Sequence, residues 1–496
     1  MNKLILLFFL ICNLSLCAQV QLGSDIDGEA VYDFSGHSVS SSSDGDRVAI
    51  GAFSNDGNGN AAGHVRIYEY SAGSWTQLGS DIDGEAAGDW SGYSVALSSG
   101  GDTVAIGATK NDGNGNDAGH VRIYTYSAGS WTQLGVDIDG EAAGDNSGNS
   151  VSLSSDGSTV AIGAQYNSDS GNVSGHVRVY EYGSGSWSQL GADIDGEAAG
   201  DYSGQTISLS NDGKTLAIGA TYNDGNGTNA GHVRVYEFLN GSWSQLGADI
   251  DGEAAGDLSG SSLSLSNDGK TLAIGATGND GNGNAAGHVR VYEFLNGSWS
   301  QLGADIDGEA AGDISGNSVS LSDDGNILAV GAKWNDGNGN MSGQSRIFSF
   351  SNNNWSQLGA DIDGEVAGDN SGQDICLSGD GTRIAIGAIN NDGNGNFAGH
   401  VRVYKTGADL ILTTSNASGT LCPNDTIKLA ARKVSGSSYL WNTGDTNHVI
   451  NIYQAGIYYV VITNSTNSID TIYQNITQNS APNTTITSNT SLAFCQ

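Results

Sequence analysis

The segment QLGSDIDGEAAGD, residues 77–89, carries four carboxylates at a spacing that suits a metal ion. Counted from the first of them, positions 1, 3, 5 and 9 are filled by Asp81, Asp83, Glu85 and Asp89. Alternating oxygen ligands of this kind wrap Ca²⁺ in loop sites. However, the glycine of such a loop belongs at position 6 and a bidentate glutamate at position 12, and neither is present. Two interpretations of this segment therefore remain open, a calcium loop and an acidic turn that pairs with arginine.

A second polar loop, NDGNGN, offers a similar ligand pattern. Asp112, Asn114 and Asn116 stand at positions 1, 3 and 5, with glycine between them. The ninth residue is His120, which is a poor calcium ligand. A hairpin loop explains the same residues equally well. If either loop binds a cofactor, we expect Ca²⁺, and the two loops could share one ion.

Both loops recur with a period of 56 residues. The pair Gln-Leu appears seven times, beginning at residues 21, 77, 133, 189, 245, 301 and 357. Within one repeat, residues 91–98, 103–108, 120–126 and 131–138 alternate or are rich in β-branched side chains, and Gly, Asn and Asp supply the turns. Seven such units predict an all-β fold, a seven-bladed β-propeller of four-stranded blades.

The ends of the repeat region predict how the ring closes. The last repeat stops at HVRVYK, residues 400–405, without its fourth strand, whereas QVQLGSDI, residues 19–26, supplies that strand at the other end. We therefore expect the N-terminal strand to complete the last blade and leave no open sheet edge. Because strand direction alternates, both polar loops emerge on one face, where they gather 35 of the 54 acidic residues. Such a face concentrates cations.

Three residue types recur once per repeat inside this pattern. Arginine makes bidentate bonds to carboxylates, so we interpret the arginine that recurs in every repeat as a structural residue that holds a loop carboxylate. These arginines are Arg66, Arg122, Arg178, Arg234, Arg290, Arg346 and Arg402. Histidine opens the third strand of six repeats, and Gln344 replaces it in the sixth repeat. One histidine per repeat lies on a circle and cannot converge on one zinc ion, so a structural role is expected. A recurring tryptophan at the start of the fourth strand predicts packing between blades.

Signals of catalysis are missing from the sequence. There is no H-E-x-x-H and no G-x-S-x-G motif, and seven near-identical repeats argue against one unique active site. We therefore expect no enzymatic activity, with a hydrolase site at the pore mouth, where the repeats diverge, as the alternative. Trp90 and Trp334 depart from the pattern near the long loops and are candidate ligand contacts.

Composition and the N-terminus indicate a compartment. The formal net charge of −36 argues against nucleic-acid binding, which depends on Lys and Arg. Residues 1–18 are typical of a secretory signal peptide, and no stretch is long enough to span a membrane. We expect a secreted or cell-surface monomer.

The repeat SGxSVSLSxDGxxxAIGAxxNDGNGxxxGHVRVYE, followed by WxQLG, resembles the FG-GAP repeat, the blade unit of integrin α-chain propellers and of many secreted microbial proteins. The resemblance implies a seven-bladed propeller over residues 19–407 that serves extracellular adhesion or ligand binding. Integrin-type repeats carry a D-x-D-x-D-G calcium loop between the first and second strands. Here that connection is only Ser-x-Asp-Gly, as at 155–157, so the family's calcium residues have no counterparts.

The period ends near residue 408. Residues 408–483 resemble immunoglobulin-like or PKD-like modules, which implies a small β-sandwich, and residues 484–496 echo its beginning. We therefore expect a second, truncated module, while disulfides at Cys422 and Cys495 stay open. The resulting prediction is a non-enzymatic binding or adhesion protein with an extracellular protein or polysaccharide as partner. A lectin-like carbohydrate binder and a glycoside hydrolase are the alternatives.

Overall fold

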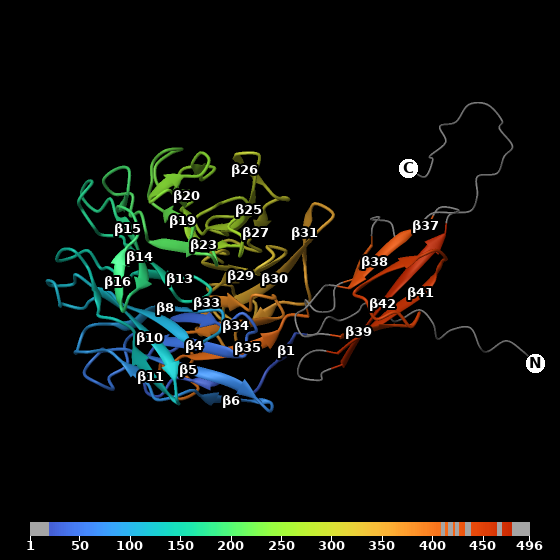
Figure 1. Cartoon of the computed structure of the whole chain (residues 1–496), viewed down its shortest axis with the longest axis horizontal. Helices are drawn as coiled ribbons and strands as arrows, with labels where there is room; N and C mark the ends of the chain where they lie inside the picture. The colour runs from blue at the N-terminus through green and yellow to red at the C-terminus, as the bar shows by residue number, and fades with distance from the viewer. Residues whose placement is uncertain are drawn as a thin grey trace, which may run out of the picture. The chain divides into compact units, whose positions relative to one another are not determined.

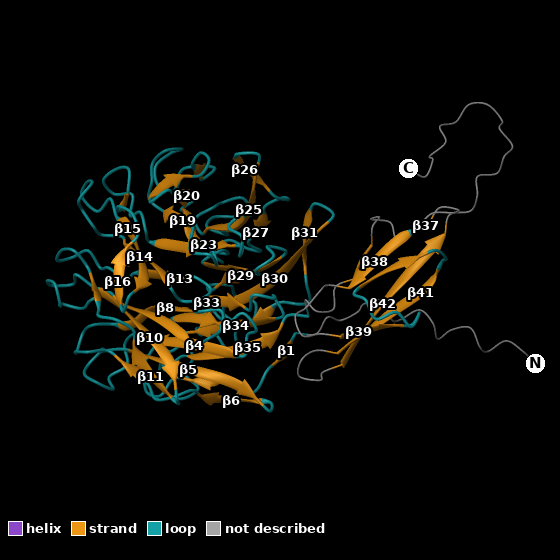
Figure 2. Ribbon diagram, viewed as in Figure 1, coloured by secondary structure: helices purple, strands orange, loops and turns teal. Residues whose placement is uncertain are grey.

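The computed structural model describes residues 19–407, 412–414, 420–421, 426–431, 438–463 and 469–478. These residues form strands, turns and loops, and none of them is helical (Figure 2). The chain divides into two compact units, Met1–Thr406 and Gly407–Gln496. The predicted signal peptide, Cys422, Cys495 and residues 484–496 lie outside the described residues.

The first unit contains seven antiparallel sheets that follow one another around a ring (Figure 1). Blade two shows the pattern, with β8 (Ser91–Leu97), β9 (Thr103–Ala108), β10 (His120–Ser127), β11 (Ser130–Gln133) and β12 (Ile138–Asp139). Both β11 and β12 pair with β10, so the fourth strand is divided into two short pieces. The predicted all-β, seven-bladed propeller of four-stranded blades is confirmed.

The other blades repeat this arrangement. Blade one has β3 (Ser38–Ser41), β4 (Arg47–Ala52), β5 (His64–Ser71), β6 (Ser74–Gln77) and β7 (Ile82–Asp83). Blade three has β13 (Ser150–Leu153), β14 (Thr159–Ala164), β15 (His176–Gly183), β16 (Ser186–Gln189) and β17 (Ile194–Asp195). Blade four has β18 (Thr206–Leu209), β19 (Thr215–Ala220), β20 (His232–Leu239), β21 (Ser242–Gln245) and β22 (Ile250–Asp251).

The remaining blades complete the ring. Blade five has β23 (Ser259–Leu265), β24 (Thr271–Ala276), β25 (His288–Leu295), β26 (Ser298–Gln301) and β27 (Ile306–Asp307). Blade six has β28 (Ser318–Leu321), β29 (Ile327–Ala332), β30 (Gln344–Ser351), β31 (Asn354–Gln357) and β32 (Ile362–Asp363). Blade seven has β33 (Ser371–Leu377), β34 (Arg383–Ala388) and β35 (His400–Lys405), and its outer strand positions are taken by β1 (Val20–Gln21) and β2 (Ile26–Asp27).

The hydrophobic core lies between neighbouring blades. One cluster joins Val65 and Ile67 of blade one to Val95 and Ile106 of blade two, and all four side chains are at least nine-tenths buried. Trp131 packs against the same cluster, and its Nε1 donates a hydrogen bond to the Leu78 carbonyl of the preceding blade at 2.7 Å. The predicted role of the recurring tryptophan in packing between blades is therefore confirmed.

The second unit is built from two sheets in its described part. One contains β36 (Leu412–Thr414), β38 (Ile427–Ala431) and β40 (Val449–Ile452). The other contains β37 (Thr420–Leu421), β42 (Ile469–Gln478), β41 (Gly456–Thr463) and β39 (Ser438–Trp441). Leu429 and Ile452 of the first sheet share a buried core with Trp441 and Val460 of the second.

Among the residues that the structure describes, no helix has the length and apolar character to cross a membrane.

Candidate metal centre

The two polar loops of neighbouring blades are bound to each other. In blade two, the Asn114 side chain donates hydrogen bonds to the carbonyls of Gly140 and Glu141, which belong to the crossover that leads to blade three. Gly84, in the preceding crossover, passes so close to the Ala62 carbonyl that a Cβ atom would lie 2.0 Å from its oxygen. The glycine of the DIDGE segment therefore fixes where the following glutamate lies.

Six of the seven crossover glutamates lie near a histidine of the next blade. At blade two, Oε2 of Glu85 lies 3.9 Å from Nδ1 of His120, and Oδ2 of Asp137 lies 3.9 Å from the same nitrogen. The glutamate comes from the blade-one crossover, while the histidine opens β10 and the aspartate follows β11 in the sequence. Three potential ligands from two blades thus surround one point, with all their donor atoms within 4.8 Å of one another.

The histidine of this trio is buried and neutral. His120 is 1% exposed, and burial lowers the pKa of its imidazole below the usual value, with the nearby Arg122 as a second cause. Its Nε2 has no hydrogen-bond partner among the described residues, and the 3.9 Å contacts of Nδ1 are too long for hydrogen bonds. In His176 the unpartnered buried atom is Nδ1 itself, which faces Glu141 at 3.7 Å.

The trio recurs around the ring. Six groups of this kind occur in the described residues, among them Glu29–His64–Asp81, Glu85–His120–Asp137, Glu141–Asp169–His176, Glu197–His232–Asp249 and Asp25–Glu365–His400. At His288 the Nδ1 atom lies 3.9 Å from Glu253. In blade six, Gln344 takes the histidine position and donates a 3.1 Å hydrogen bond to Glu309.

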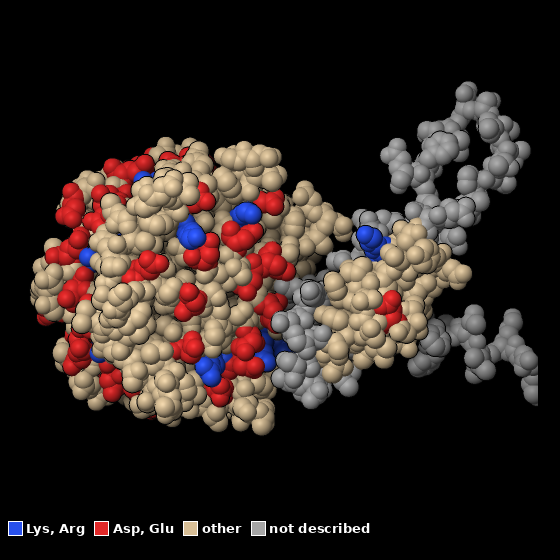
Figure 3. All heavy atoms as spheres, viewed as in Figure 1, with Lys and Arg blue, Asp and Glu red and all other residues tan. Residues whose placement is uncertain are grey.

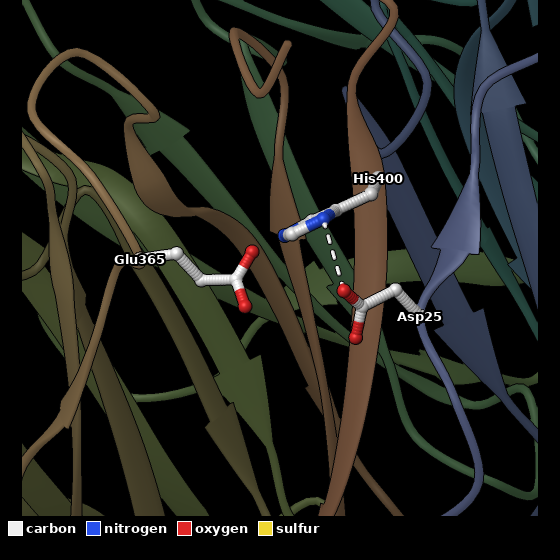
Figure 4. Close-up of side chains that lie close together, drawn as sticks. All are labelled: Asp25, Glu365 and His400. Carbon is white, nitrogen blue, oxygen red and sulfur yellow. Dashed lines mark ion pairs between the residues drawn. The ribbon is translucent and has the colours of Figure 1, made fainter. Parts of the chain in front are cut away.

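Figure 4 shows the centre of blade seven. Asp25, from the N-terminal segment, and Glu365, from the crossover after blade six, approach His400 from two sides. The Oδ2 atom of Asp25 lies 3.8 Å from Nδ1 of His400. The N-terminal segment therefore supplies a carboxylate to the group of the last blade.

These groups fit a divalent metal ion. Zinc binds imidazole nitrogen and carboxylate oxygen at about 2.0–2.2 Å, so two ligands of one ion lie about 3–4 Å apart. The observed separations of 3.7–4.0 Å between nitrogen and oxygen fall at the upper end of that range. A neutral imidazole has a lone pair to give, and the glutamate is 45% exposed at blade two, which leaves room for water or substrate.

The four carboxylates predicted to bind one ion in a single loop lie in different surroundings in the structure. Asp81 joins the centre of His64, whereas Glu85 joins the centre of His120. The backbone carbonyl of Asp83 accepts a 2.7 Å hydrogen bond from Arg122. Asp89 is 4% exposed, and its Oδ2 accepts hydrogen bonds from the Ala86 amide and the Asn111 side chain. Four carboxylates of one segment therefore do not gather around one point.

The NDGNGN residues also have structural partners. The Asp112 carboxylate accepts a 2.8 Å hydrogen bond from the Asp117 amide and caps its own loop. Asn114 joins the two loops as described above, and the Asn116 carbonyl accepts a hydrogen bond from the Gly144 amide. These contacts give the loop residues structural roles, and metal binding by them stays a prediction.

The recurring arginine lies beside each centre. The Arg122 guanidinium donates to the Asp83 carbonyl, and its Nη1 lies 3.7 Å from Oε1 of Glu85. The same guanidinium stands 5.5 Å from the centroid of the Tyr124 ring. The same guanidinium–carbonyl hydrogen bond is made at the other six positions, by Arg66, Arg178, Arg234, Arg290, Arg346 and Arg402. The arginine therefore orients the glutamate of the centre next to it.

Sequence reasoning missed the histidines because it looked for ions at the ring axis or within one loop. The signal was present in the spacing, since each histidine lies 35 residues after a glutamate and 17 before an aspartate in blade two. These residues are far apart in sequence and become neighbours in space only through strand pairing, in which His120 stands opposite Asp139 between β10 and β12.

Acidic residues are frequent on the surface of the propeller. Figure 3 shows Asp and Glu scattered over the visible face of the propeller, with few Lys and Arg among them. Two tryptophans stand at positions where the repeats differ. Trp90 stacks with Tyr93 at 6.2 Å and has the Lys110 ammonium 5.7 Å from its ring centroid, whereas Trp334 is 41% exposed.

A cavity of about 450 Å³ adjoins the centre of blade four. Its lining includes Glu197 and Asp201 of the crossover and Tyr222 and Asp224 of the long loop. Glu197 also belongs to the group of His232. The cavity and this group share Glu197, whereas His232 and Asp249 do not line the cavity.

Comparisons with known proteins agree with the fold. The FG-GAP repeat family matches residues 82–124 and 193–236, which lie in two of the seven repeats. The chain carries FG-GAP repeats. Each matched FG-GAP segment begins at the first or second residue of a DIDGE crossover and ends shortly after the histidine and arginine of the following blade. No curated protein matches this sequence.

Solved propellers resemble the structure at low sequence identity. Hydrazine synthase of Kuenenia stuttgartiensis is 14% identical with a TM-score of 0.49, over 78% of this chain and 98% of that chain. The periplasmic gluconolactonase PpgL of Pseudomonas aeruginosa is 17% identical with a TM-score of 0.46, over 66% of this chain and 85% of that chain. At these identities the likeness concerns the fold alone.

The names of these structures nevertheless correct one expectation. The sequence analysis predicted a non-enzymatic binding or adhesion protein, and the similar solved propellers are named as enzymes. The expectation that the chain has no enzymatic activity is therefore withdrawn, although the likeness itself assigns no activity to this chain. The similarity of the repeats was taken to exclude an active site. The six His/Asp/Glu groups and the cavity at blade four show that similar repeats can still carry side chains suited to an active site.

Proposed function

We propose that the propeller of this FG-GAP repeat protein is a metal-dependent hydrolase. The observation that carries the proposal is the buried, neutral histidine whose Nδ1 faces two partly exposed carboxylates without a hydrogen bond. Catalytic zinc sites have three protein ligands and an open position, whereas structural zinc sites have four. Glu85, His120 and Asp137 would be the ligands at blade two, and the other groups would act in the same way.

The ligand chemistry favours zinc over calcium. Imidazole suits Zn²⁺ and similar metals, whereas Ca²⁺ prefers six to eight oxygen ligands. When bound in such a site, the metal lowers the pKa of a coordinated water to near neutrality and polarises a carbonyl oxygen. The calcium expected from the sequence would need additional oxygen ligands, and the titration described below compares the two ions.

The protein groups around each centre would position the reactants. The glutamate holds its ligand oxygen in place through Arg122, which itself is fixed by the Asp83 carbonyl at 2.7 Å. Hydrolysis of an ester adds a water oxygen to the carbonyl carbon and breaks the bond from that carbon to the alcohol oxygen. One water proton passes to the leaving oxygen, so the reaction needs only water and the ester.

The test uses the full chain. Metal is removed with a chelator, and ZnCl₂, MnCl₂ and CaCl₂ are titrated separately by calorimetry. We expect about six zinc ions per chain, one for each group, and zinc-dependent hydrolysis of 4-nitrophenyl acetate, with 4-nitrophenyl glycosides tested in parallel. Failure of zinc to bind, or ester hydrolysis that is unaffected by chelation, would overturn the proposal.

The cellular setting is part of the same proposal. The apolar residues 4–16 and the small residue Ala18 support secretion to the medium or the cell surface, and the acidic surface supports a partner other than nucleic acid. We also propose that the pairing of β1 with β35 closes the ring and that residues 408–483 form an immunoglobulin-like or PKD-like sandwich. The shared core around Trp441 supports the sandwich.

A further inference from the structure

Six aromatic side chains form a continuous row beside the polar loops, at the junctions of blades seven, one and two. Neighbouring ring centroids lie 5.4–6.2 Å apart, in the order Tyr32, Phe397, Phe34, Phe53, Trp90 and Tyr93. We call these six residues the aromatic row. It is separate from the candidate metal centres, whose groups consist of His, Asp and Glu.

Four residues of the aromatic row have a backbone conformation that costs energy. The φ angle is +65° at Tyr32, +55° at Phe34, +60° at Trp90 and +54° at Phe397. Bulky residues with positive φ are uncommon, and such strain gathers at binding and catalytic sites. At the position of Tyr32 the other six crossovers have glycine, as at Gly88. The Tyr32 side chain is 53% exposed, so neither burial nor backbone geometry accounts for a tyrosine there.

Blade two supplies a cation to one ring of the row. The Lys110 ammonium lies 5.7 Å from the centroid of the Trp90 ring and 3.4 Å from Oδ2 of Asp117. A cation above an aromatic face is attracted by the negative charge density of the ring. This contact is therefore an intramolecular example of ammonium binding by the row.

The equivalent place in blade one lacks its cation. In the repeat alignment, Phe34 takes the position of Trp90 and Ser54 takes that of Lys110. The Ser54 hydroxyl carries no charge, and the repeat that contains Phe34, residues 21–76, has no lysine of its own. Phe397 lies 5.9 Å from Phe34, and Tyr32 lies 5.7 Å from Phe397 at the exposed end of the row. An ammonium ion from solution would meet three aromatic rings here.

Charge at this end of the row favours a cation. The exposed Asp392 carboxylate accepts a 2.8 Å hydrogen bond from the Phe397 amide, and the Glu29 side chain is 45% exposed. Carboxylates and aromatic faces attract cations, whereas carboxylates repel anions. Alkylated ammonium ions suit aromatic rings because their methyl groups also pack on the ring faces.

We infer that the Tyr32–Phe397–Phe34 end of the aromatic row is a binding site for a small alkylated ammonium ion. The ion would lie against Phe34 as Lys110 lies against Trp90. The inference goes beyond the proposed hydrolase, since binding here requires no metal. Free choline and phosphocholine carry the same headgroup, and the carboxylates of the propeller disfavour the phosphate-bearing form.

Binding is measured on the full chain by ligand-observed NMR with tetramethylammonium chloride, both with zinc and after chelation. We expect saturable binding in both conditions, at least about fivefold tighter than that of ammonium chloride at equal ionic strength. Choline should bind more tightly than phosphocholine. Equal, non-saturating association of both ammonium ions would reflect only counterion attraction by the acidic surface and would overturn the inference. Binding of methyl glucoside without binding of tetramethylammonium would overturn it in favour of sugar stacking.

A matched pair of variants locates the site. Phe34→Asn copies Asn146 and Asn370, which stand at the same position of their repeats, and should weaken tetramethylammonium binding at least about fivefold. Leu258→Asn makes the same change in blade five, outside the aromatic row, and should leave the binding unchanged. Equal effects of the two variants would contradict the location.

Two further variants separate recognition from structure. Tyr32→Gly restores the glycine of the other crossovers, so the melting temperature should stay close to that of wild type while tetramethylammonium binding weakens. Ser54→Lys copies Lys110 and should supply the cation from within the chain, which blocks the site. Ser158→Lys copies Lys214, adds the same charge on a short loop and should leave binding unchanged. Binding that survives both Tyr32→Gly and Ser54→Lys would overturn the inference, whereas the zinc stoichiometry and ester hydrolysis test the proposed function independently.

Discussion

The Nδ1 atom of His176 lies 3.7 Å from Oε2 of Glu141, although the two residues belong to different blades. The nitrogen is buried and has no hydrogen-bond partner among the described residues. Burying an unpaired polar atom costs about 1–3 kcal/mol. A metal ion held between Glu141 and His176, as proposed above, would offset this cost at blade three.

A seventh centre can be built in blade six. Gln344 already donates hydrogen bonds to Glu309 and Asp363, so the variant Gln344→His would place an imidazole beside two carboxylates. Zinc stoichiometry measured by calorimetry should rise by one ion per chain, and the melting temperature with zinc should rise as well. Gln344→Leu is the control, and an unchanged stoichiometry in Gln344→His would contradict the assignment of the trios.

Loss of one arginine should destabilise the ring even without metal. Arg122 is 6% exposed and donates to the Asp83 carbonyl, so Arg122→Met leaves a carbonyl acceptor unpaired. We expect a loss of about 1–3 kcal/mol in the free energy of unfolding, measured by denaturant titration. Lys214→Met changes one exposed cation as a control. A variant as stable as wild type would show that the arginine serves only the metal centre.

Asp374 should make stability fall as the pH rises. Six blades have Ser or Thr at this position, whereas Asp374 accepts hydrogen bonds from the Val39 amide and the Ser318 hydroxyl. Burial raises the pKa of the Asp374 carboxyl from 3.8 to about 6. The folded chain therefore binds the proton more tightly than the unfolded chain, and stability present at pH 4 is lost as the pH passes 6.

The variant Asp374→Ser removes this dependence. A shift of about 2 pH units corresponds to about 3 kcal/mol, which is an upper limit for the gain of the variant relative to wild type between pH 4 and 7.5. Denaturant unfolding at both pH values measures the difference, and acid effects common to both proteins cancel. A stability difference that is the same at both pH values would contradict the assignment.

Removal of the first strand should weaken the last blade. Leu22 is 8% and Ile26 is 4% exposed, and both pack in the cluster that includes Val401 and Val403. Ile26→Ala should cost about 2–4 kcal/mol, similar to Ile82→Ala at the same position of blade one. Deletion of residues 19–27 should lower the melting temperature far more than either. If the deletion melts like wild type, the N-terminal strand does not close the ring.

The fold could be predicted because each repeat carries its own strand signals. The 56-residue period, the alternation in residues 120–126 and the Gly/Asn turns all lie within short windows of sequence. The division of the fourth strand into β11 and β12 was not predicted. Because both pieces pair with β10, the hydrophobic periodicity of the sequence does not reveal that the strand is interrupted at residues 134–137.

The centres could not be predicted by counting ligands along one segment. Asp81 and Glu85 stand four residues apart but face different histidines, because the crossover between them changes blade. Burial of His120 also depends on strand pairing rather than on its neighbours in sequence. Carboxylates of one segment therefore face groups of different blades, and metal binding by any of them stays a prediction.

Contacts between blades always join residues at the same offset. The arginine-to-carbonyl bond spans 39 residues at Arg66 and again at Arg402, and the tryptophan bond spans 53 residues at Trp75 and at Trp355. Each of the first six 56-residue repeats, counted from Gln21, therefore contains one such arginine and one such tryptophan. Unequal crossing-over within the gene would insert or delete whole blades and leave every junction intact. The number of blades would then be limited only by the curvature at which the ends of the chain can still meet.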